Sequence, residues 1–579
     1  MKIKLARTSG FCYGVRRAVN LAFEAALDKG NLYTLGELIH NPQVLEILKM
    51  RGVKVAKNVQ DIPENSSVII RSHGVSPAVK EELNRRKLEI IDATCPKVAR
   101  VQMLAQRAAR SGNHLIIFGD RQHSEVKGIA AYGGKRVNIV KDLRGLRRVL
   151  SDIPTGQKIT LVAQTTQNLG TWGELKQLLK ETRSNTEVYE TICDATDKRQ
   201  GEVRKLAREV EAMVVVGGFA SGNTRRLAEI AEEEGARAFH VEKEADLNIR
   251  ELSKYRTIGV TAGASTPSWM IRRILHALEK IREKRNSFLS FLASFWQFIV
   301  RSNILVASGA AGLLYAATRL QKIEPELAYQ WIVAAYVFGT HLLNHFTDRF
   351  STQIKYPARV EFYARYRRLL LTLGILGLAS SLVVAYILGP FTFSLIFALS
   401  LFGLVYRVQL FERRQVWPRR LMDIPGSKDL FLGLAWTAVI AVLVVPASGS
   451  TFSPATGISA LFVFSIAFTR SLVYSIRDVQ GDRMVGRETI PVLAGEKNSR
   501  RLGTFVLVIA AAGLIFSFIM GWCSPLALFF ILSLGYAFIT LILTRAEWLY
   551  SDVLFETIVE GNLFLTMIIA YVVYLAKLI

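Results

Sequence analysis

The sequence predicts an α/β domain in the first half of the chain and an all-helical membrane bundle in the second half. Residues 1–285 alternate short apolar runs with amphipathic stretches of helical period, whereas long apolar segments fill the chain from about residue 291. Such alternation is typical of βαβ units with parallel sheets. The length of 579 residues also favours more than one domain, because single hydrophobic cores stop growing at roughly 250 to 300 residues.

The composition excludes several classes of protein. The net charge is +25, yet 50% of the residues are hydrophobic, which argues against an ordinary soluble protein that binds nucleic acid. Four cysteines are too few for a disulfide scaffold and indicate a reducing compartment. The opening residues MKIKLARTSGFC contain no apolar signal-peptide core, so we expect the first half to stay in the cytosol.

Individual segments support the two-domain organisation. KITLVAQ (158–164) and AMVVVGG (212–218) have the length and composition of buried parallel strands. The basic stretch LEKIREKRNS (278–287) is the predicted linker. We therefore expect one domain at residues 1–285 and a second at residues 286–579.

About nine apolar segments follow the linker, and most approach the roughly 20 residues that are needed to cross a bilayer. Gly389 and Pro390 separate the third segment from the fourth. The segments are 296–318, 328–347, 369–389, 390–411, 430–446, 457–476, 502–520, 525–544 and 562–578. The sequence thus predicts a multi-pass bundle of about nine transmembrane helices in the lipid bilayer.

Loop charges bear on this topology, because short cytoplasmic loops are enriched in Lys and Arg. With the first half in the cytosol, the inward loops are 348–368, 412–429, 477–501 and 545–561, and the first three are rich in these residues. The outward loop PASGSTFSPATG carries no charge. The pattern favours a cytoplasmic first half, and it explains much of the positive charge without a nucleic-acid partner.

Cys12, Cys95 and Cys193 are too far apart for a local metal motif, but their surroundings repeat. Each follows a predicted strand and precedes a predicted helix, whose N-terminus lowers a thiol pKa and favours an anionic ligand. Three thiolates without a fourth protein ligand suit an iron–sulfur cluster with one open iron. We expect three related α/β units around this central cluster. The alternative is that all three cysteines are small buried core residues.

Polar residues end the other predicted strands or lie close to them. In open α/β sheets the ligand crevice lies outside the carboxyl ends of the strands, so these side chains can face one cavity. They are His40, His73, His123, Glu125, Thr165, Thr166, Ser221, Asn223 and Ser265. His, Ser and Asn suit an anionic group such as a diphosphate, and Glu125 is the carboxylate placed to move a proton. Taken singly, each could instead be a loop or helix-capping residue.

Eight ordered motifs surround these positions over essentially all of residues 1–280. They are FCYGV, ELIHNP, RSHGV, DATCP, HSEV, TICDAT, ASGNTRRL and TAGAST. They resemble the motifs of the 4-hydroxy-3-methylbut-2-enyl diphosphate reductase (LytB/IspH) family. The resemblance implies reductive dehydroxylation of that diphosphate to isopentenyl and dimethylallyl diphosphate, the last step of the methylerythritol phosphate pathway. It also implies a ferredoxin or flavodoxin as the electron donor.

The resemblance further implies a role for each site residue. Cys12, Cys95 and Cys193 would hold a [4Fe–4S] cluster. The diphosphate would be bound by His40, His73, His123, Ser221, Asn223 and Ser265. Quinolinate synthase also holds such a cluster with three cysteines from three α/β units, but the match of successive motifs favours the reductase.

Two details of the predicted site depend on this resemblance. Glu125 would donate the proton together with a threonine, which we place at Thr165, with Thr166 as the alternative. Gly222 stands where the family often has a serine, so one hydroxyl is missing and a backbone N–H could substitute.

Two polar clusters border the apolar segments of the second half. LLNHFTDRF contains Asn344 and Asp348, and SIRDVQGDRM contains Asp478 and Asp482 at i and i+4 on one helix face. Carboxylates at this spacing can hold Mg²⁺ against a diphosphate. The alternative for the second pair is ion pairing with the neighbouring Arg477 or Arg483.

These clusters, together with KDLFLGLAW at 428–436, resemble the motifs of the UbiA family of membrane prenyltransferases. The resemblance implies a Mg²⁺-dependent prenyl transfer from a prenyl diphosphate at Asn344, Asp348, Asp478 and Asp482. The last position of the usual first motif is Thr352 here, which removes one carboxylate. A second hypothesis is therefore that this half serves only as an anchor or interaction module.

Overall fold

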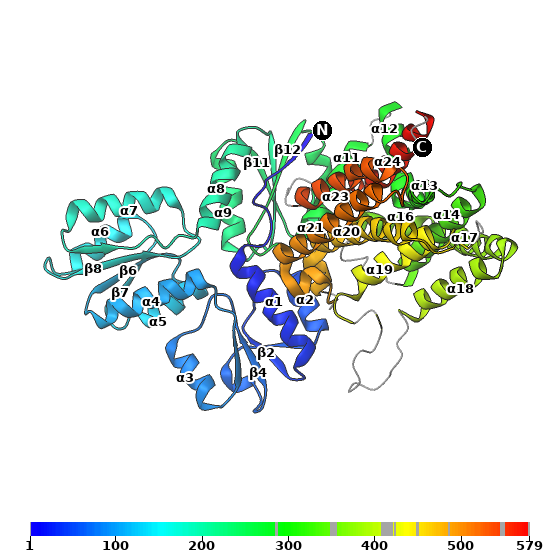
Figure 1. The fold of residues 1–579 in the computed structure, drawn as a ribbon. Helices are drawn as coiled ribbons and strands as arrows, with labels where there is room; N and C mark the ends of the chain where they lie inside the picture. Colours follow the sequence, from blue (N-terminus) through cyan, green and yellow to red (C-terminus); the bar gives the residue numbers. More distant parts are fainter. Residues whose placement is uncertain are drawn as a thin grey trace. The chain divides into compact units, whose positions relative to one another are not determined.

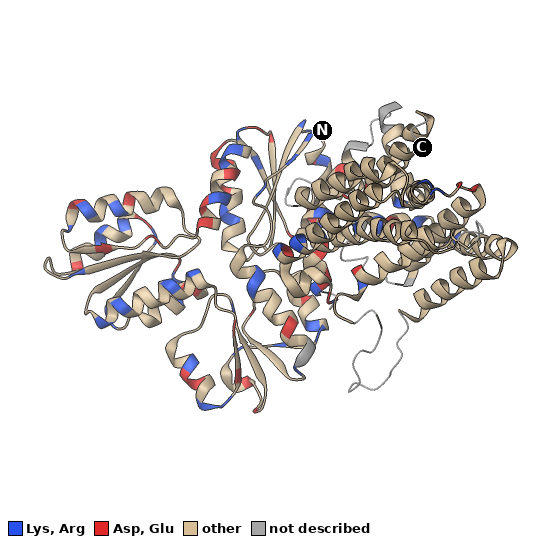
Figure 2. Cartoon of the chain, in the orientation of Figure 1, with Lys and Arg blue, Asp and Glu red and all other residues tan. Residues whose placement is uncertain are grey.

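The computed structural model divides the chain into two units, Met1–Arg282 and Glu283–Ile579. The structure describes these residues: 2–283, 288–347, 356–406, 421, 424–446, 451–484, 487–544 and 551–576. Charged side chains are scattered over the helices of the first unit, whereas the long helices of the second unit are largely uncharged (Figure 2).

Three four-stranded parallel sheets form the first unit, as predicted for three related α/β units (Figure 1). The first sheet has the order β1 (Lys2–Leu5), β12 (Thr257–Ala262), β10 (Ala212–Val216) and β11 (Arg237–Val241). The second has the order β3 (Val53–Ala56), β2 (Leu32–Leu35), β4 (Ser67–Ile70) and β5 (Glu89–Asp92). The third has the order β7 (Val137–Val140), β6 (His114–Phe118), β8 (Ile159–Ala163) and β9 (Thr186–Val188).

Helices lie between the parallel strands, because each crossover must return the chain to the same edge of the sheet, and the last helix follows β12. They are α1 (Tyr13–Asp28), α2 (Pro42–Met50), α3 (Pro77–Arg85), α4 (Pro96–Arg110), α5 (Ser124–Tyr132), α6 (Leu143–Asp152), α7 (Leu169–Thr182), α8 (Asp194–Ala207), α9 (Gly222–Glu233), α10 (Ile249–Leu252) and α11 (Ser268–Glu283). Two short 3₁₀ turns are η1 (Val59–Asp61) and η2 (Glu244–Asp246).

The central strands are buried on both faces, which explains their continuous apolar sequences. In β6, Ile116 and Phe118 pack against the side of the sheet that α6 and α7 cover. Their neighbours Leu115 and Ile117 pack on the opposite side, against α4 and α5. Side chains alternate between the two faces of a strand, so a strand between two helical layers has no polar face. Such strands end in loops that carry the polar side chains.

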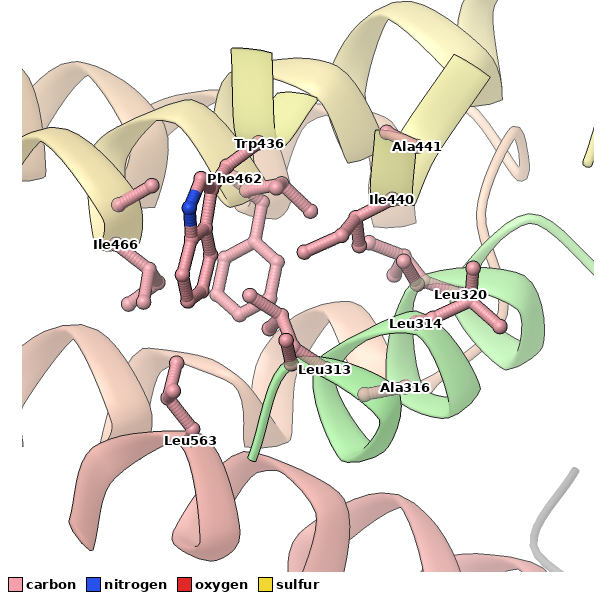
Figure 3. Close-up of a cluster of buried hydrophobic side chains, with 14 of the residues drawn as sticks. Leu313, Leu314, Ala316, Leu320, Trp436, Ile440, Ala441, Phe462, Ile466 and Leu563 are labelled. Atoms are coloured by element: carbon pink, nitrogen blue, oxygen red, sulfur yellow. The ribbon is translucent and has the colours of Figure 1, made fainter. Parts of the chain in front are cut away.

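Helices make up the described part of the second unit. They are α12 (Phe288–Arg301), α13 (Ile304–Leu320), α14 (Leu327–Thr347), α16 (Pro357–Arg365), α17 (Arg367–Leu388), α18 (Pro390–Val405), α19 (Ser427–Thr437), the π-helical turn η4 (Ala438–Val442), α20 (Pro454–Met484), α21 (Ile490–Ile519), α22 (Leu526–Phe529), α23 (Ile531–Leu543) and α24 (Asp552–Leu575). Their core joins α13, α19, α20 and α24 through side chains such as Leu313, Trp436, Phe462 and Leu563 (Figure 3).

Five helices within the described residues are long and apolar enough to cross a membrane, and the pair α12 and α13, bent by 65°, makes a sixth if it is one span. The sequence predicted about nine spans, so the structure supports a multi-pass helical unit with five to six candidate spans. Two of the predicted segments correspond to α14 and to α18, which has 16 residues. His341, Asn344 and His345 of α14 line a pocket, and such polar side chains lower the apolar content of that helix.

Small residues allow close helix packing in this unit. A Cβ on Gly339 of α14 would lie 2.8 Å from the carbonyl oxygen of Gly374 and 2.8 Å from the amide nitrogen of Leu378, both on α17. Because these are backbone atoms, no change of rotamer could relieve the contact. A Cβ on Gly403 of α18 would meet no atom within 4 Å.

We predict that Gly339→Ala destabilises the second unit by about 1–3 kcal/mol, because the two helices must move apart. Gly403→Ala is the matched control and is expected to be neutral or slightly stabilising, since alanine favours a helix. Thermal unfolding of the two variants in detergent checks this. An unchanged melting temperature for G339A would show that α14 and α17 are not packed through Gly339.

Candidate functional site

A pocket in the first unit brings the predicted site residues of all three sheets together. It is lined by Cys12, His40, His73, Cys95, His123, Glu125, Thr165, Thr166, Cys193, Ser221, Gly222, Asn223 and Ser265. They come from loops at the carboxyl ends of strands or from the helix starts that follow. The fold therefore brings these side chains together in one cavity, as the sequence predicted.

The three cysteines occupy equivalent positions. Cys12 precedes α1, Cys95 precedes α4 and Cys193 precedes α8, and each is the N-cap of its helix with an extended backbone. At such a position several backbone N–H groups of the first turn have no partner within the helix. The three helix starts therefore direct partial positive charge toward the thiols.

Backbone hydrogen bonds tie each cysteine to a loop that carries another site residue. The N–H of Cys12 donates to the carbonyl of Ala264 (3.1 Å), next to Ser265. The N–H of Cys95 donates to the carbonyl of Ser72 (2.9 Å), next to His73, and the N–H of Cys193 donates to the carbonyl of Thr165 (2.9 Å). These hydrogen bonds thus hold the thiols at fixed positions relative to the polar side chains.

The thiol of Cys95 packs closely against the first turn of α1. A Cβ on Gly14 would lie 2.4 Å from Sγ of Cys95, so only glycine fits there. Burial raises the pKa of the Cys95 thiol, and Cys12 and Cys193 add to this effect against the N–H groups of α4. The expectation of a lowered thiol pKa is therefore wrong for Cys95, because burial and, to a smaller extent, the two other thiols outweigh the N–H groups of α4.

Three histidine rings gather beside the thiols. Ring centroids are 5.0 Å apart for His40 and His73, 5.3 Å for His73 and His123, and 6.0 Å for His40 and His123. Burial, with the other two histidines, lowers the pKa of His73 well below its usual value, and burial lowers the pKa of His123 to about 4. Their ligating nitrogens lie within 4.8 Å of one another, close enough to contact one small ion.

Two buried polar atoms in this pocket have no hydrogen-bond partner among the described residues. They are Nδ1 of His73 and Nδ2 of Asn223. A buried polar group without a partner costs about 1–3 kcal/mol, so both positions favour a polar ligand. An anionic ligand would also stabilise the protonated imidazoles.

Ser221 and Ser265 lie on neighbouring loops of the same pocket. Ser221 caps α9 and accepts a hydrogen bond from the N–H of Thr224 (3.4 Å), and Ser265 donates from its hydroxyl to the carbonyl of His40 (3.2 Å). A Cβ on Gly222 would meet no atom within 4 Å. The start of α9 therefore has open space where a ligand can approach the backbone N–H groups.

Glu125 is buried and held by Thr165. The carboxylate accepts hydrogen bonds from the backbone N–H of Thr165 (2.8 Å) and from its hydroxyl (3.1 Å). Burial raises the pKa of Glu125 in spite of these bonds. A carboxyl group with a raised pKa can hold a proton near neutral pH and release it to a ligand.

A second pocket lies in the second unit and contains two of the four residues predicted there. Asn344 and Asp478 line it, and Asp478 accepts a hydrogen bond from the hydroxyl of Tyr356. Asp482 is fully buried one turn further along α20. Asp348, like Thr352, lies outside the described residues.

Each half of the chain is similar to a known protein family. Residues 3–279 match the family model of the LytB protein. The chain is 43% identical over 288 residues to the 4-hydroxy-3-methylbut-2-enyl diphosphate reductase of Geobacter sulfurreducens, covering 49% of this chain and 99% of that protein. The chain belongs to the LytB family. The reductase of Geotalea uraniireducens is 42% identical over 286 residues, covering 49% of this chain and all of that protein.

The second half carries a UbiA prenyltransferase family domain, since residues 305–552 match that family model. A solved UbiA homologue from Archaeoglobus fulgidus, bound to GPP and Mg²⁺, is 14% identical with a TM-score of 0.37, covering 48% of this chain and 98% of its own. A reductase structure from Plasmodium falciparum is 28% identical with a TM-score of 0.46, covering 48% and 87%.

Sequence reasoning missed several residues of the LytB pocket. Arg199 lines it and donates to the carbonyl of Gly10 (2.8 Å), two residues before Cys12. Lys97 and Asp194 form an ion pair (3.0 Å) between the first turns of α4 and α8. Lys97 directly follows the DATCP motif and Asp194 lies within the TICDAT motif, so both positions were an available signal.

In the UbiA domain, sequence reasoning missed the charged residues opposite α20. Glu556 and Glu560 of α24 line the pocket together with Arg359 and Arg470. The sequence reading placed both glutamates in the inward loop 545–561, whereas the structure places them in α24, which begins at Asp552. The sequence offered Arg477 as an ion-pair partner of Asp478. In the structure Arg477 forms an ion pair with Asp552 of α24 (2.5 Å).

Because the pKa of Glu125 is raised, we predict that the free energy of unfolding of the LytB domain depends on pH. The folded domain binds this proton more tightly than the unfolded chain, so the contribution favours folding at low pH and is lost as the pH rises through the folded pKa. Glu125→Gln cannot ionise, so its stability relative to the wild type should increase as the pH rises above the ordinary carboxyl pKa of about 4.3.

Hydrogen exchange of β8 in the intact chain reports on the LytB domain alone and measures this gain. Glu64→Gln, at an exposed position, is the matched control and should show a constant difference. A gain for E125Q that shrinks toward alkaline pH would contradict a raised pKa.

Proposed function

We propose that residues 1–285 catalyse the reductive dehydroxylation of 4-hydroxy-3-methylbut-2-enyl diphosphate to isopentenyl and dimethylallyl diphosphate. The observation that carries this proposal is one pocket that joins three helix-capping thiols, a cluster of anion-binding side chains and a buried carboxyl group. The reductases of Geobacter sulfurreducens and Geotalea uraniireducens support the assignment by their similarity over nearly their full lengths.

The thiols fit a [4Fe–4S] cluster held by Cys12, Cys95 and Cys193. The pocket supplies three soft ligands and three positive helix ends, and Gly14 allows the Cys95 thiol to approach α1 closely. Such a cluster would supply single electrons and a Lewis-acidic iron. A ferredoxin or flavodoxin is the electron donor that we propose.

The diphosphate end of the substrate is positioned by the opposite side of the pocket. His40, His73 and His123 surround an anion, with Nδ1 of His73 and Nδ2 of Asn223 ready to take a partner. Ser221 and Ser265 add hydroxyl groups, and the backbone N–H at Gly222 takes the place of the missing hydroxyl. Fixing the diphosphate fixes the distance between the substrate hydroxyl and the thiols.

Glu125 supplies the proton for the leaving hydroxyl. The reaction consumes two electrons and two protons: one proton leaves in water and the other is added to carbon. Burial raises the pKa of the Glu125 carboxyl and so favours its protonated form, and Thr165 holds it through two hydrogen bonds. Thr165 is therefore our choice over Thr166 as the partner of Glu125.

The test uses the full chain in detergent, reconstituted anaerobically with iron and sulfide and supplied with a chemical reductant. We expect wild-type protein to consume the hydroxylated diphosphate and release both products. Glu125→Gln should keep its iron content and lose roughly 10²-fold or more in kcat. Glu64→Gln is the control. A normal cluster without turnover in the wild type would refute the reductase, and loss of iron in E125Q would refute the role of Glu125.

For residues 286–579 we propose a Mg²⁺-dependent prenyl transfer in the membrane, with the LytB domain on the cytoplasmic side. Membership of the UbiA prenyltransferase family supports this, as does the pocket that holds Asn344 and Asp478 beside Lys428. Asp482 adds a carboxylate on the same face of α20, and Asp348 is the fourth residue proposed at this Mg²⁺-diphosphate site. The transfer needs a longer prenyl diphosphate than the LytB domain makes, so the two steps are not consecutive.

The membrane activity is tested with full-length protein, Mg²⁺, labelled prenyl diphosphate and aromatic acceptors. We expect diphosphate release that depends on Mg²⁺ and falls at least about 10²-fold in Asp478→Asn, because the metal loses a ligand. Glu326→Gln, at an exposed position between α13 and α14, is the control. No release with any acceptor would favour the anchor hypothesis.

A further inference from the structure

We propose that the UbiA domain prenylates a neutral, hydroxyl-bearing acceptor and rejects carboxylic acids. This inference rests on the proposed prenyl transfer and concerns the acceptor that enters the same pocket. Its basis is the pairing of Arg359 and Arg470 with Glu556 and Glu560 in the pocket wall.

Both ion pairs are largely buried. Nη2 of Arg359 lies 2.6 Å from Oε2 of Glu556, and the two side chains are 12% and 8% exposed. Nη2 of Arg470 lies 2.6 Å from Oε1 of Glu560, with exposures of 10% and 4%. The two glutamates are one helical turn apart on α24, so this wall presents two neutralised arginines.

Further contacts fix both arginines in place. Nε of Arg470 lies 2.8 Å from Oε2 of Glu560, so the pair is bidentate, and the hydroxyl of Tyr474 donates to Glu560 (2.9 Å). The guanidinium of Arg470 also lies over the ring of Trp436, 5.0 Å from its centroid. Arg359 makes a second, longer contact with a backbone carbonyl of α12.

An acceptor carboxylate would have to displace a glutamate to reach either arginine. The displaced carboxylate would remain buried beside the incoming one, and breaking a buried pair in this way is strongly unfavourable because it leaves an uncompensated charge. An acid that left the pairs intact would be an additional anion beside two buried glutamates, in a wall whose arginines are already paired. Both routes disfavour acids.

The other cations of the pocket wall are Lys428 and Arg487. Lys428 has Asp478 and Asp482 among its charged neighbours and donates to Ser475 (3.1 Å). It therefore belongs to the part of the pocket that we assign to the metal and the diphosphate. Within the described residues, the wall by α24 holds no arginine that is not already paired with a glutamate.

A neutral hydroxyl compound suits this wall. Its O–H groups can donate to carboxylate oxygens of Glu556 and Glu560, and its oxygen can accept from an arginine, without either ion pair breaking. Prenyl transfer breaks the bond between C1 and the diphosphate oxygen and forms a bond from the acceptor to C1. Diphosphate and the proton of the acceptor are released, so no redox partner is needed.

The experiment compares 4-hydroxybenzoate with 4-hydroxybenzyl alcohol, which replaces the carboxylate by a hydroxymethyl group. Full-length protein in bilayer nanodiscs receives Mg²⁺ and labelled prenyl diphosphate, and prenylated product is measured. Glu556→Gln and Glu560→Gln each release one arginine from its ion pair, and Glu326→Gln is the matched control. A thermal shift with each acceptor and a non-reactive thiolodiphosphate analogue measures binding without turnover.

We expect the wild type to use the alcohol at least about tenfold better than the acid, equivalent to about 1.4 kcal/mol. The glutamine variants should narrow or reverse this ratio, and E326Q should not change it. Preference for the acid, or a ratio that is unchanged in both glutamine variants, overturns the inference while leaving prenyl transfer intact. If neither acceptor gives product or a thermal shift, the proposed acceptor site is wrong. Diphosphate release with other acceptors then decides whether the proposed prenyl transfer stands.

Discussion

The LytB domain depends on three backbone hydrogen bonds that join each cysteine to the loop of a neighbouring strand. They run from the N–H groups of Cys12, Cys95 and Cys193 to the carbonyls of Ala264, Ser72 and Thr165. Because each carbonyl is beside or within a site residue, the bonds set the spacing between the thiols and the groups that would hold substrate. Parallel sheets make this possible, since all their strands end at the same edge.

The UbiA domain buries charged side chains within a largely apolar bundle. Arg359 and Arg470 are each paired with a glutamate of α24, and Arg470 has further contacts with Trp436 and Tyr474. Trp436 also belongs to the core that joins α13, α19, α20 and α24 (Figure 3). The packing that stabilises the bundle thus also orients the charges of its pocket, and an ionised group there is stable only with its partner.

Sequence reasoning worked best where a single local signal decides the structure. A strand, a cysteine and an amphipathic helix in succession predicted three equivalent helix starts, and the polar strand ends predicted one shared cavity. It failed where the answer depends on distant neighbours. The pKa of Cys95 is raised instead of lowered, because burial and two other thiols outweigh its own helix. Apolar length predicted about nine spans, of which the described residues support five to six as candidates by helix length and composition.

By itself, the sequence determined the order of the elements, the division into an α/β half and an apolar helical half, and the residue types needed for each chemistry. These properties follow from local periodicity and composition, which each segment carries alone. The tertiary structure decided which groups meet. It placed Thr165 against Glu125, grouped three histidines within one ion's reach, and paired two arginines with glutamates nearly 90 and 200 residues away. Distances across a fold depend on packing between elements, and no local pattern encodes them.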